Sequence, residues 1–530
     1  MKNRLIIAVA LSFLVLIFWQ SFMSKVYHID NTVVTQESPI NQTVNPKSSS
    51  MMPDSSLLLS SSGETKESSP RITLDRVVTD KLEIEFINPG ASIYRVYLKD
   101  YKLNTQITGA LYSRLFQDEI YTLQKNINKI ELSKTKSGHS LIQRLNFRNN
   151  SYNIDLETIY KNESGENWTL NDDLILTSVY RNLKPEDARL YEAVFIDNES
   201  QSSKRKNIFT IKDRYVHSES WTALAFRDRY ATIIIKPEDT SKISPFIVQH
   251  NSAAQTGLAL GNIIIPPSGQ FMLKSRIYCG PQDVNLLKDS KLGFEEVVHY
   301  GTFDFISTAL LAVMNFFHRV THSWGVALIL LSLFIYSILY PLTLKQMRSM
   351  KEMQELQPKI EAIRKSCKDN PQRQNKEIME LYKNHKVNPM GGCLPMILQI
   401  PIFFGLYQAL SRSISLKGSG FLWIKDLAEP DKLFLLSQSL PFIGKEINIL
   451  PILMAIAMFF QQKISLKSSA AANSQAMEQQ KMMLVLMPVM FGFIFYHFPS
   501  GLALYWFLST ILTTVSQWKT LKIKTLVPKN

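Results

Sequence analysis

The side chains most able to do chemistry in this sequence are polar groups inside apolar segments of its C-terminal half. Hydroxyl and amide side chains in such segments commonly bond to a neighbouring helix or to their own backbone. Lysine, arginine, aspartate and glutamate are absent from the central stretches, so an ion or proton relay is not indicated. The polar groups are Ser332, Tyr336, Ser337, Gln399, Gln408, Tyr505, Trp506, Ser509, Thr510, Thr513 and Thr514.

The sequence contains no recognisable enzyme motif. HExxH, G-x-S-x-G and P-loop patterns are absent, and the scattered carboxylates of the middle region form no spaced catalytic pair. Cys279, Cys367 and Cys393 form no CxxC pair, which predicts isolated thiols and no metal site. No cofactor is therefore expected, and a sugar-active enzyme in the middle region is a rival hypothesis without a motif behind it.

Charge and hydropathy together indicate a membrane protein. The chain has 530 residues, 45% of them hydrophobic, and a formal net charge of +14. Apolar residues gather at residues 5–19 and again after residue 324, and lysines and arginines flank these segments. This arrangement favours anionic lipid and membrane topology as the reason for the basic charge, so DNA is not an expected partner.

The N-terminal apolar run predicts a membrane anchor. Lys2 and Arg4 precede the run Leu5–Trp19, and no A-x-A cleavage site follows it. We expect an uncleaved signal-anchor span over residues 1–23, with a cleaved signal peptide as the alternative. Residues 24–70 are rich in Ser, Thr, Asn and Pro, a composition typical of a disordered linker.

Residues 71–300 carry the alternating pattern of β-strands. Leu82, Ile84 and Phe86 alternate with acidic residues, and the turn residues Asn88-Pro89-Gly90 end that run. Further short β-rich runs with turn signals follow, and long helical periods are rare. The pattern predicts a large antiparallel β-sandwich domain on the outer side of the membrane.

The C-terminal half predicts a bundle of membrane spans. Residues 301–322 fit an interfacial amphipathic helix, because Asp304 and Asn315 interrupt its apolar character. With the N-terminal anchor, five further spans give an α-helical polytopic protein of six spans, and its basic loops and tail fall inside, as the positive-inside rule requires. The expected spans are residues 323–343, 394–412, 447–462, 482–498 and 499–518. The joining segments are a cytoplasmic helical hairpin at 344–393, an outer loop at 413–446, a cytoplasmic loop at 463–481 and a basic cytoplasmic tail at 519–530.

The cytoplasmic hairpin has a methionine-rich face. Met347, Met350 and Met353 recur at helical spacing in a segment that also carries Lys351, Lys359 and Arg364. Two interpretations stay open. The methionines either pack the hairpin against itself, or their soft, adaptable side chains contact varied apolar segments of other proteins.

Several short motifs resemble the YidC family of membrane protein insertases, in its Gram-negative form. The match extends over nearly the whole chain, is strongest from residue 324 onward, and follows the family order of anchor, outer β domain and basic hairpin. The motifs are Tyr340-Pro341-Leu342-Thr343, Leu356-Gln357-Pro358-Lys359-Ile360, the run from Asn388 to Pro395, Gln399-Ile400-Pro401-Ile402-Phe403, Leu450-Pro451-Ile452-Leu453-Met454 and Phe498-Pro499-Ser500-Gly501-Leu502.

The resemblance implies a non-enzymatic insertase that folds inner-membrane proteins, alone or beside the Sec translocon. It implies a polar groove open to cytoplasm and lipid, which lowers the barrier for polar flanks to cross hydrocarbon. Nascent inner-membrane proteins, Sec components, membrane lipid and the ribosome are the implied partners, and both termini are cytoplasmic. The implied groove residues are Ser332, Tyr336, Gln399, Tyr505, Trp506 and Ser509, and the implied substrate or ribosome contacts are Met347, Met350, Met353, Lys351, Lys359 and Arg364. A membrane transporter or channel is the alternative, although no inverted repeat relates the two halves.

One position departs from the family pattern. Members typically carry an arginine four residues before the tyrosine of the Tyr-Pro-Leu-Thr motif. In this sequence that tyrosine is Tyr340, and Tyr336 stands at the arginine position. Arg319 and Arg412 lie near the outer ends of helices and do not replace it. The departure implies a groove that works by polarity and hydration alone, or one with a narrower substrate range.

Overall fold

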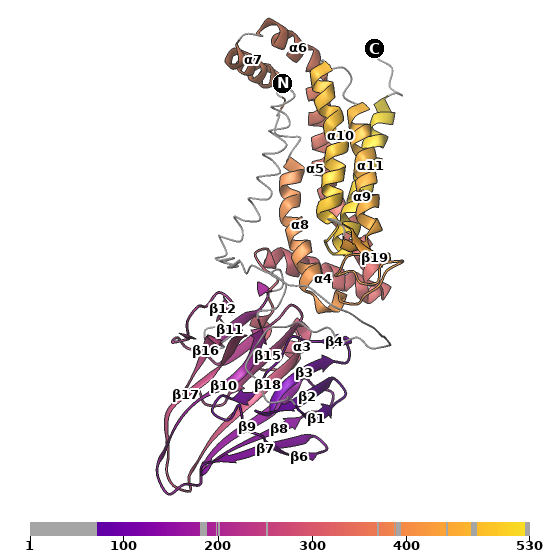
Figure 1. The fold of residues 1–530 in the computed structure, drawn as a ribbon. Coiled ribbons are helices and arrows are strands. Elements are labelled where there is room, and N and C mark those ends of the chain that lie inside the picture. The colour runs from indigo at the N-terminus through magenta and orange to yellow at the C-terminus, as the bar shows by residue number, and fades with distance from the viewer. Residues whose placement is uncertain are drawn as a thin grey trace, which may run out of the picture.

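A computed structural model of the chain describes residues 72–524 apart from short internal segments, and the predicted anchor and linker lie outside the described residues. A β-rich domain forms one end of the molecule and a helical region forms the other (Figure 1). The prediction of a β-rich domain followed by a helical C-terminal region is confirmed. The internal segments that are not described are residues 181–187, 198, 200–201, 251–252, 368–369, 386, 388–393, 441–443 and 468–473.

The largest sheet of the β-rich domain is antiparallel and has nine strands, in the order β12-β11-β14-β15-β18-β9-β8-β7-β6. Its strands are β6 Thr122–Asn126, β7 Lys129–Lys136, β8 His139–Phe147, β9 Asn153–Asn162, β11 Glu192–Asp197, β12 Ser202–Asn207, β14 Ala223–Arg227, β15 Ala231–Pro237 and β18 Gln270–Pro281. Two smaller antiparallel sheets accompany it, in the orders β13-β16-β17-β10-β5 and β1-β2-β3-β4. Their strands are β1 Ile72–Val78, β2 Leu82–Asn88, β3 Ser92–Leu98, β4 Leu103–Asn104, β5 Tyr112–Ser113, β10 Trp168–Tyr180, β13 Tyr215–Val216, β16 Ile243–His250 and β17 Ala253–Ile265.

One hydrophobic core joins the three sheets of this domain. Ile84 of β2, Leu156 of β9 and Leu174 of β10 are all buried in the same cluster. The predicted alternation holds in β2, whose leucine, isoleucine and phenylalanine positions are buried while the intervening glutamates are only partly buried. Gly90 lies in the turn after this strand at φ +87°, and a Cβ there would lie 2.6 Å from the Gln117 carbonyl oxygen, so the turn requires glycine.

The helical region begins where the nine-stranded sheet ends. Helix α4 lies between the β-rich domain and the bundle, and α6 and α7 lie at the far end of the molecule (Figure 1). The helices are α3 Val284–Asp289, η1 Glu295–Val297, α4 Asp304–Thr321, α5 Trp324–Glu355, α6 Gln357–Ser366, α7 Pro371–Asn384, α8 Leu394–Arg412, η3 Ile414–Leu416, α9 Ile449–Lys467, α10 Ser474–Phe495 and α11 Ser500–Lys524.

The span and the first arm of the hairpin are less separate than the sequence suggests. Helix α5 contains Pro341 and continues past residue 343 to Glu355. It breaks at Leu356, directly before α6 begins. The turn into α7 forms where it is expected, since Asn370 caps that helix by accepting a hydrogen bond from the Arg373 amide at 3.0 Å.

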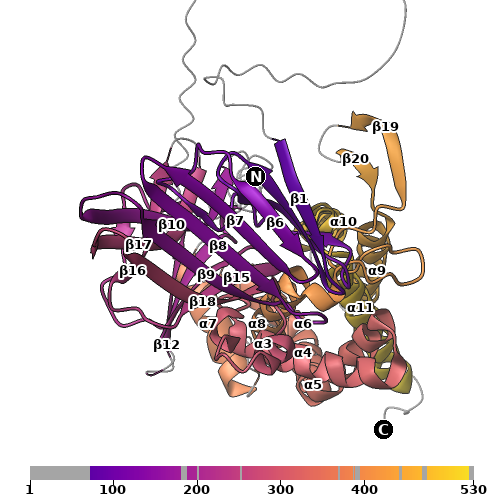
Figure 2. The same ribbon diagram turned by 90° about the horizontal axis from the view of Figure 1, so that it is seen from below.

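The predicted outer loop contains a hairpin that sequence patterning did not reveal. Strand β19, Phe434–Leu440, pairs antiparallel with β20, Gly444–Ile447. Figure 2 places this hairpin at the side of the molecule, near α9 and α10. Phe434 and Leu435 are both more than half exposed, so they carry no buried period-2 pattern by which a strand is recognised.

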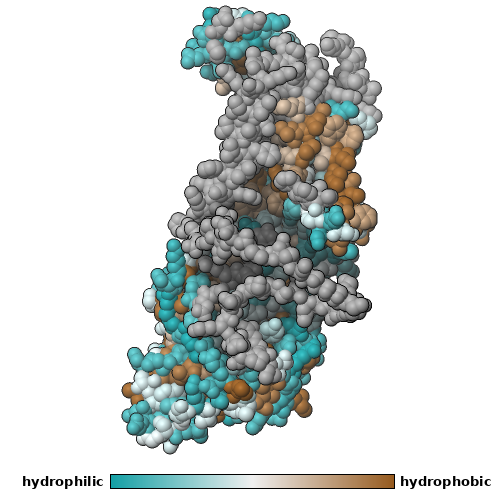
Figure 3. Space-filling view, in the orientation of Figure 1, coloured by the Kyte–Doolittle hydropathy of each residue, from teal (hydrophilic) through white to brown (hydrophobic). Residues whose placement is uncertain are grey.

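Apolar surface gathers on the helical region, whereas the α6–α7 hairpin is mainly hydrophilic on the face shown in Figure 3. Among the described residues, one helical stretch, Trp324–Ser349, is long and apolar enough to cross a membrane by length and composition. Ile449–Ser465 and Leu484–Phe495 are shorter apolar helical stretches. The count of six spans therefore stays a prediction.

Candidate functional site

A line of polar side chains runs along one face of α11. Tyr505, Ser509, Thr513 and Ser516 are spaced by four, four and three residues, which places them on the same side of a helix. We call these four residues the polar stripe. Ser509, Thr513 and Ser516 are partly buried, whereas Tyr505 is 1% exposed. The stripe is therefore neither fully packed away nor fully open.

Helix α8 meets the polar stripe at Tyr505. The Gln399 amide nitrogen donates a hydrogen bond to the Tyr505 hydroxyl, and Ser509 also hydrogen-bonds that hydroxyl from one turn further along α11. Two residues predicted to share a groove, Gln399 and Tyr505, are thus in direct contact although 106 positions separate them. Each polar group in this apolar setting finds a partner, as buried amides and hydroxyls require.

Helix α5 meets the same stripe at its other end through Tyr336. The Tyr336 hydroxyl donates to the Leu512 carbonyl oxygen at 3.2 Å and is hydrogen-bonded to the Ser516 hydroxyl. Its ring also lies 5.9 Å from that of Tyr340, centroid to centroid. Tyr336 therefore links α5 to α11 by its hydroxyl, and its side chain is only partly buried.

Ser332 and Trp506 lie apart from these contacts. The Ser332 hydroxyl donates to the Leu328 carbonyl oxygen of its own helix at 2.8 Å and is 1% exposed. The Trp506 ring packs among phenylalanines, with centroids 5.4 Å from Phe403 and Phe495 and 5.8 Å from Phe491. The structure thus brings Tyr336, Gln399, Tyr505 and Ser509 onto the stripe, and it places the other two predicted groove residues in helix packing.

The predicted contact residues of the hairpin lie in different surroundings. Met353 packs against the small hydrophobic cluster of Leu356, Ile360 and Val387, which is the self-packing role. Lys359 and Arg364 are exposed, and the Lys359 ammonium lies 2.9 Å from Nε2 of His385. Met347 is partly buried on α5, and the side chains of Met350 and Lys351 lie outside the described part of the structure.

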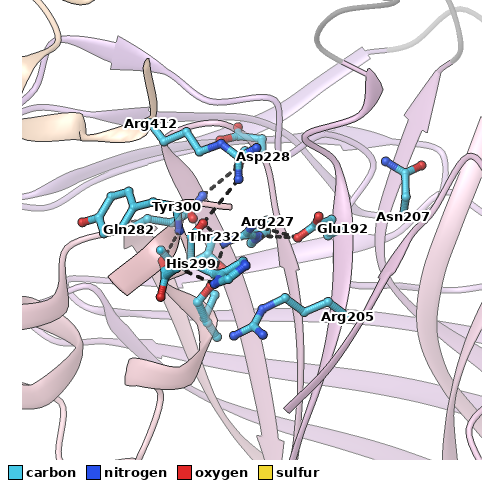
Figure 4. A network of polar contacts seen from close by, with 12 residues as sticks. Glu192, Arg205, Asn207, Arg227, Asp228, Thr232, Gln282, His299, Tyr300 and Arg412 are labelled. Atoms are coloured by element: carbon cyan, nitrogen blue, oxygen red, sulfur yellow. Dashed lines mark hydrogen bonds and ion pairs between the residues drawn. The ribbon is translucent and has the colours of Figure 1, made fainter. Parts of the chain in front are cut away.

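A second polar site joins the β-rich domain to the helical region (Figure 4). Arg227, at the end of β14, pairs with Glu192 of β11 at 2.7 Å, and its side chain is 4% exposed. The same guanidinium donates to the carbonyl oxygens of Val297 and His299, at 2.9 and 3.0 Å. His299 in turn pairs with Asp304, the first residue of α4, at 3.3 Å. The arginine therefore binds the sheet to the segment that leads into the bundle.

The turn after β14 contacts α8 directly. The Arg229 guanidinium donates to the Ser411 carbonyl oxygen at 2.7 Å and lies over the Tyr230 ring, 5.1 Å from its centroid. Beyond α8, the Lys417 ammonium pairs with Asp426 at 3.0 Å and with Glu429. Sequence reasoning missed this junction, because its arginines sit in ordinary strand and helix ends and their partners are distant along the chain.

Cys279 gives a test of the β-rich domain. The thiol is fully buried on β18, and burial raises its pKa to about 12. Because the thiolate is the reactive form, we expect Cys279 to resist maleimide at pH 8 in the folded protein and to react after unfolding. Mass spectrometry of peptides from native and denatured samples measures this, and rapid native labelling at Cys279 would contradict the packing.

These features define a class of protein. A helical region with lipid-compatible apolar surface encloses a stripe of paired polar groups, and it carries a large β-rich domain at one end. Among the described residues, no group of three metal-binding side chains occurs. The class is a membrane protein with a helical region in which polar groups of neighbouring helices pair, joined to a β-rich domain.

Comparison with known proteins identifies the family. Residues 316–526 match the family described as 60Kd inner membrane protein, and residues 116–313 match the YidC periplasmic domain. The membrane protein insertase YidC of Pelobacter propionicus is 37% identical over 378 residues, covering 70% of this chain and 67% of the relative. That of Methylobacillus flagellatus is 29% identical and covers 97% of this chain and 96% of the relative. The chain belongs to the YidC family of membrane protein insertases.

Other matches are more partial. The chain spans about half the length of two further curated relatives, the YidC insertases of Syntrophobacter fumaroxidans and Geotalea daltonii. A solved structure of an active YidC insertase also matches. The match covers 84% of this chain and 92% of the chain in that structure, at 18% identity and a TM-score of 0.38. The family assignment depends on the sequence matches, and it makes this chain an inner-membrane protein with a periplasmic domain.

Proposed function

We propose that this membrane protein insertase uses the polar stripe of α11, together with Gln399 and Tyr336, as the wall of a substrate groove. The observation that carries the proposal is the pairing of groups from α5 and α8 with one face of α11. A charged side chain that crosses the membrane costs about 2.5–3.5 kcal/mol or more at the centre of the hydrocarbon. Hydroxyls and an amide along the path offer hydrogen-bond partners during that crossing and reduce this cost.

The helices beside the stripe offer an apolar surface for the substrate's own span. Ile338 of α5 and Ile397 of α8 are each more than half exposed, and Phe334 is 43% exposed. An apolar substrate segment can lie against this surface while its polar flank follows the stripe. No enzymatic reaction is part of the proposal, because relatives in this family are insertases.

Topology and partners follow from the same proposal. The N- and C-termini are cytoplasmic, and nascent inner-membrane proteins enter from the side of the α6–α7 hairpin. The exposed Lys359 and Arg364 on that hairpin suit contact with an acidic surface such as ribosomal RNA. The β-rich domain, on the opposite end in Figure 1, is the part available to Sec translocon components. The transporter alternative is not favoured, since the family is one of insertases.

Site-specific photocrosslinking to a stalled nascent membrane protein tests the groove. A photoreactive residue at Ser509 or Thr513 should crosslink the nascent chain, because both positions are partly open along the stripe. Val489 of α10 and Phe460 of α9 are controls outside the stripe, 62% and 54% exposed on apolar helices. Crosslinks from the controls with none from the stripe would refute the groove.

A further inference from the structure

We infer that the junction between the β-rich domain and the bundle binds a phosphate group through Arg412. This residue ends α8, at the level where the helical region meets the periplasmic domain, and Figure 4 shows it beside the Arg227 network. Nothing in the proposed insertase cycle uses this arginine. The phosphate would be that of an outer-leaflet phospholipid headgroup or of free inorganic phosphate, and the chemistry of recognition is the same for both.

Arg412 carries a charge that its surroundings do not balance. Its one hydrogen bond among the described residues is to the His299 carbonyl oxygen, at 3.5 Å, which is a long contact. No carboxylate in the described part of the chain forms an ion pair with it, although the side chain is partly buried. An arginine stays protonated in proteins, so the free-energy cost of partly burying this charge is not removed by loss of a proton.

The neighbouring carboxylates are already paired with other groups. Glu192 contacts both Nε and Nη2 of Arg227, at 2.8 and 2.7 Å. Asp304 accepts a hydrogen bond from the Tyr300 amide at 2.6 Å and pairs with His299. Arg227 repels Arg412, and Glu192, which attracts Arg412, is held by Arg227. A partly buried cation without a counter-ion is costly, and an anion at this point removes that cost.

A second arginine of the junction, Arg205, also lacks hydrogen-bond partners for part of its guanidinium. Arg205 donates to the Glu296 carbonyl oxygen, but its Nε–H is buried and has no hydrogen-bond partner. Burial is the largest cause that lowers the pKa of Arg205, and the charge of Arg227 adds to it, while Glu192, Glu296 and Asp304 act in the opposite direction. Guanidinium groups bind phosphate through pairs of N–H donors, and this geometry suits a phosphate better than a single halide ion.

The position of Arg412 favours phosphate over other anions. Helix α8 is apolar and exposes Ile397, Ile400 and Phe404, so its outer end lies where headgroups meet the protein. The Arg412 guanidinium is then at headgroup depth, and the β-rich domain covers it from the other side.

Thermal unfolding of the full chain in neutral detergent tests the proposal. In phosphate-free buffer, melting is measured before and after adding inorganic phosphate against chloride of equal ionic strength. A second pair compares phosphatidylglycerol with diacylglycerol of the same chains, which lacks the phosphate. We expect phosphate, phosphatidylglycerol or both to raise the melting temperature by about 2–4 °C. The rise should be lost in Arg412→Gln and kept in Arg319→Gln, which removes an exposed arginine at the end of α4.

The outcomes separate the two sources and the rival explanation. A rise with phosphatidylglycerol alone assigns the site to lipid, a rise with inorganic phosphate alone assigns it to the free anion, and a rise with both means that either source fills it. An equal rise in Arg412→Gln, or no rise in the wild type, overturns the proposal. If Arg412→Gln fails to fold, Arg412→Lys decides, because lysine keeps the charge but loses paired donation and should show a smaller rise. A full-sized rise in that variant would also overturn it.

Discussion

Replacing Arg227 by glutamine should lower the free energy of unfolding of the β-rich domain by about 2–5 kcal/mol. The side chain is 4% exposed, and it satisfies Glu192 and two backbone carbonyls at once. The substitution leaves the Glu192 carboxylate without its counter-ion and removes the link to the segment before α4. Denaturant unfolding of the full chain in detergent, followed by the β-sheet signal in circular dichroism, measures the loss.

Arg148→Gln is the matched control for that experiment. Arg148 pairs with Asp155 at 2.9 Å in the same domain, but its side chain is 57% exposed. Exposed ion pairs contribute about 0–1 kcal/mol, so this variant should unfold almost as the wild type does. Equal losses in both variants would mean that the buried junction adds nothing to the stability of the domain.

The alternating strands were predictable because their signal is local. A strand that buries one face shows period two within a few residues, as in β2, where Leu82, Ile84 and Phe86 are buried. The β19–β20 hairpin lacks that signal, since Phe434 and Leu435 are exposed together. Its pairing depends on contacts across the turn, which a period count along one strand does not detect.

The candidate groove was predictable only in part. The stripe on α11 is visible in the sequence, because the spacing of Tyr505, Ser509 and Thr513 fixes a helix face. Which residues meet that face depends on how α5 and α8 pack, and this information is not local. Trp506 illustrates the difference: it neighbours Tyr505 in sequence, but its ring packs with Phe403, Phe491 and Phe495.

The junction arginines could not be found from sequence patterns. Arg227 draws its partners from β11, from the last residue of η1 and from the segment between η1 and α4. These elements meet only in the folded protein. Of the two interpretations left open for the methionine-rich face, Met353 fits self-packing, because it packs onto Ile360 across the break after Glu355.

Introducing arginine at position 336 should preserve insertion and increase it several-fold for substrates with acidic flanks. The Leu512 carbonyl and the Ser516 hydroxyl, which now bond Tyr336, are acceptors that a guanidinium can also use. The link from α5 to α11 is therefore kept while a positive charge is added. A charge at the centre of a span costs about 2.5–3.5 kcal/mol, and these acceptors reduce that cost. Insertion of paired substrates with acidic or neutral flanks, in vesicles containing Tyr336→Arg, measures the gain.

Tyr336→Phe distinguishes the hydroxyl from the ring at the same position. This variant keeps the aromatic packing on Tyr340 but loses both hydrogen bonds to α11. We expect insertion of acidic and neutral substrates to fall together, because a polar group of the groove wall is removed and no charge preference is created. If Tyr336→Arg were stable but inserted no substrate, Tyr336 would not line a substrate path. The tyrosine would then serve only to hold α5 against α11, and the groove would have to lie elsewhere in the bundle.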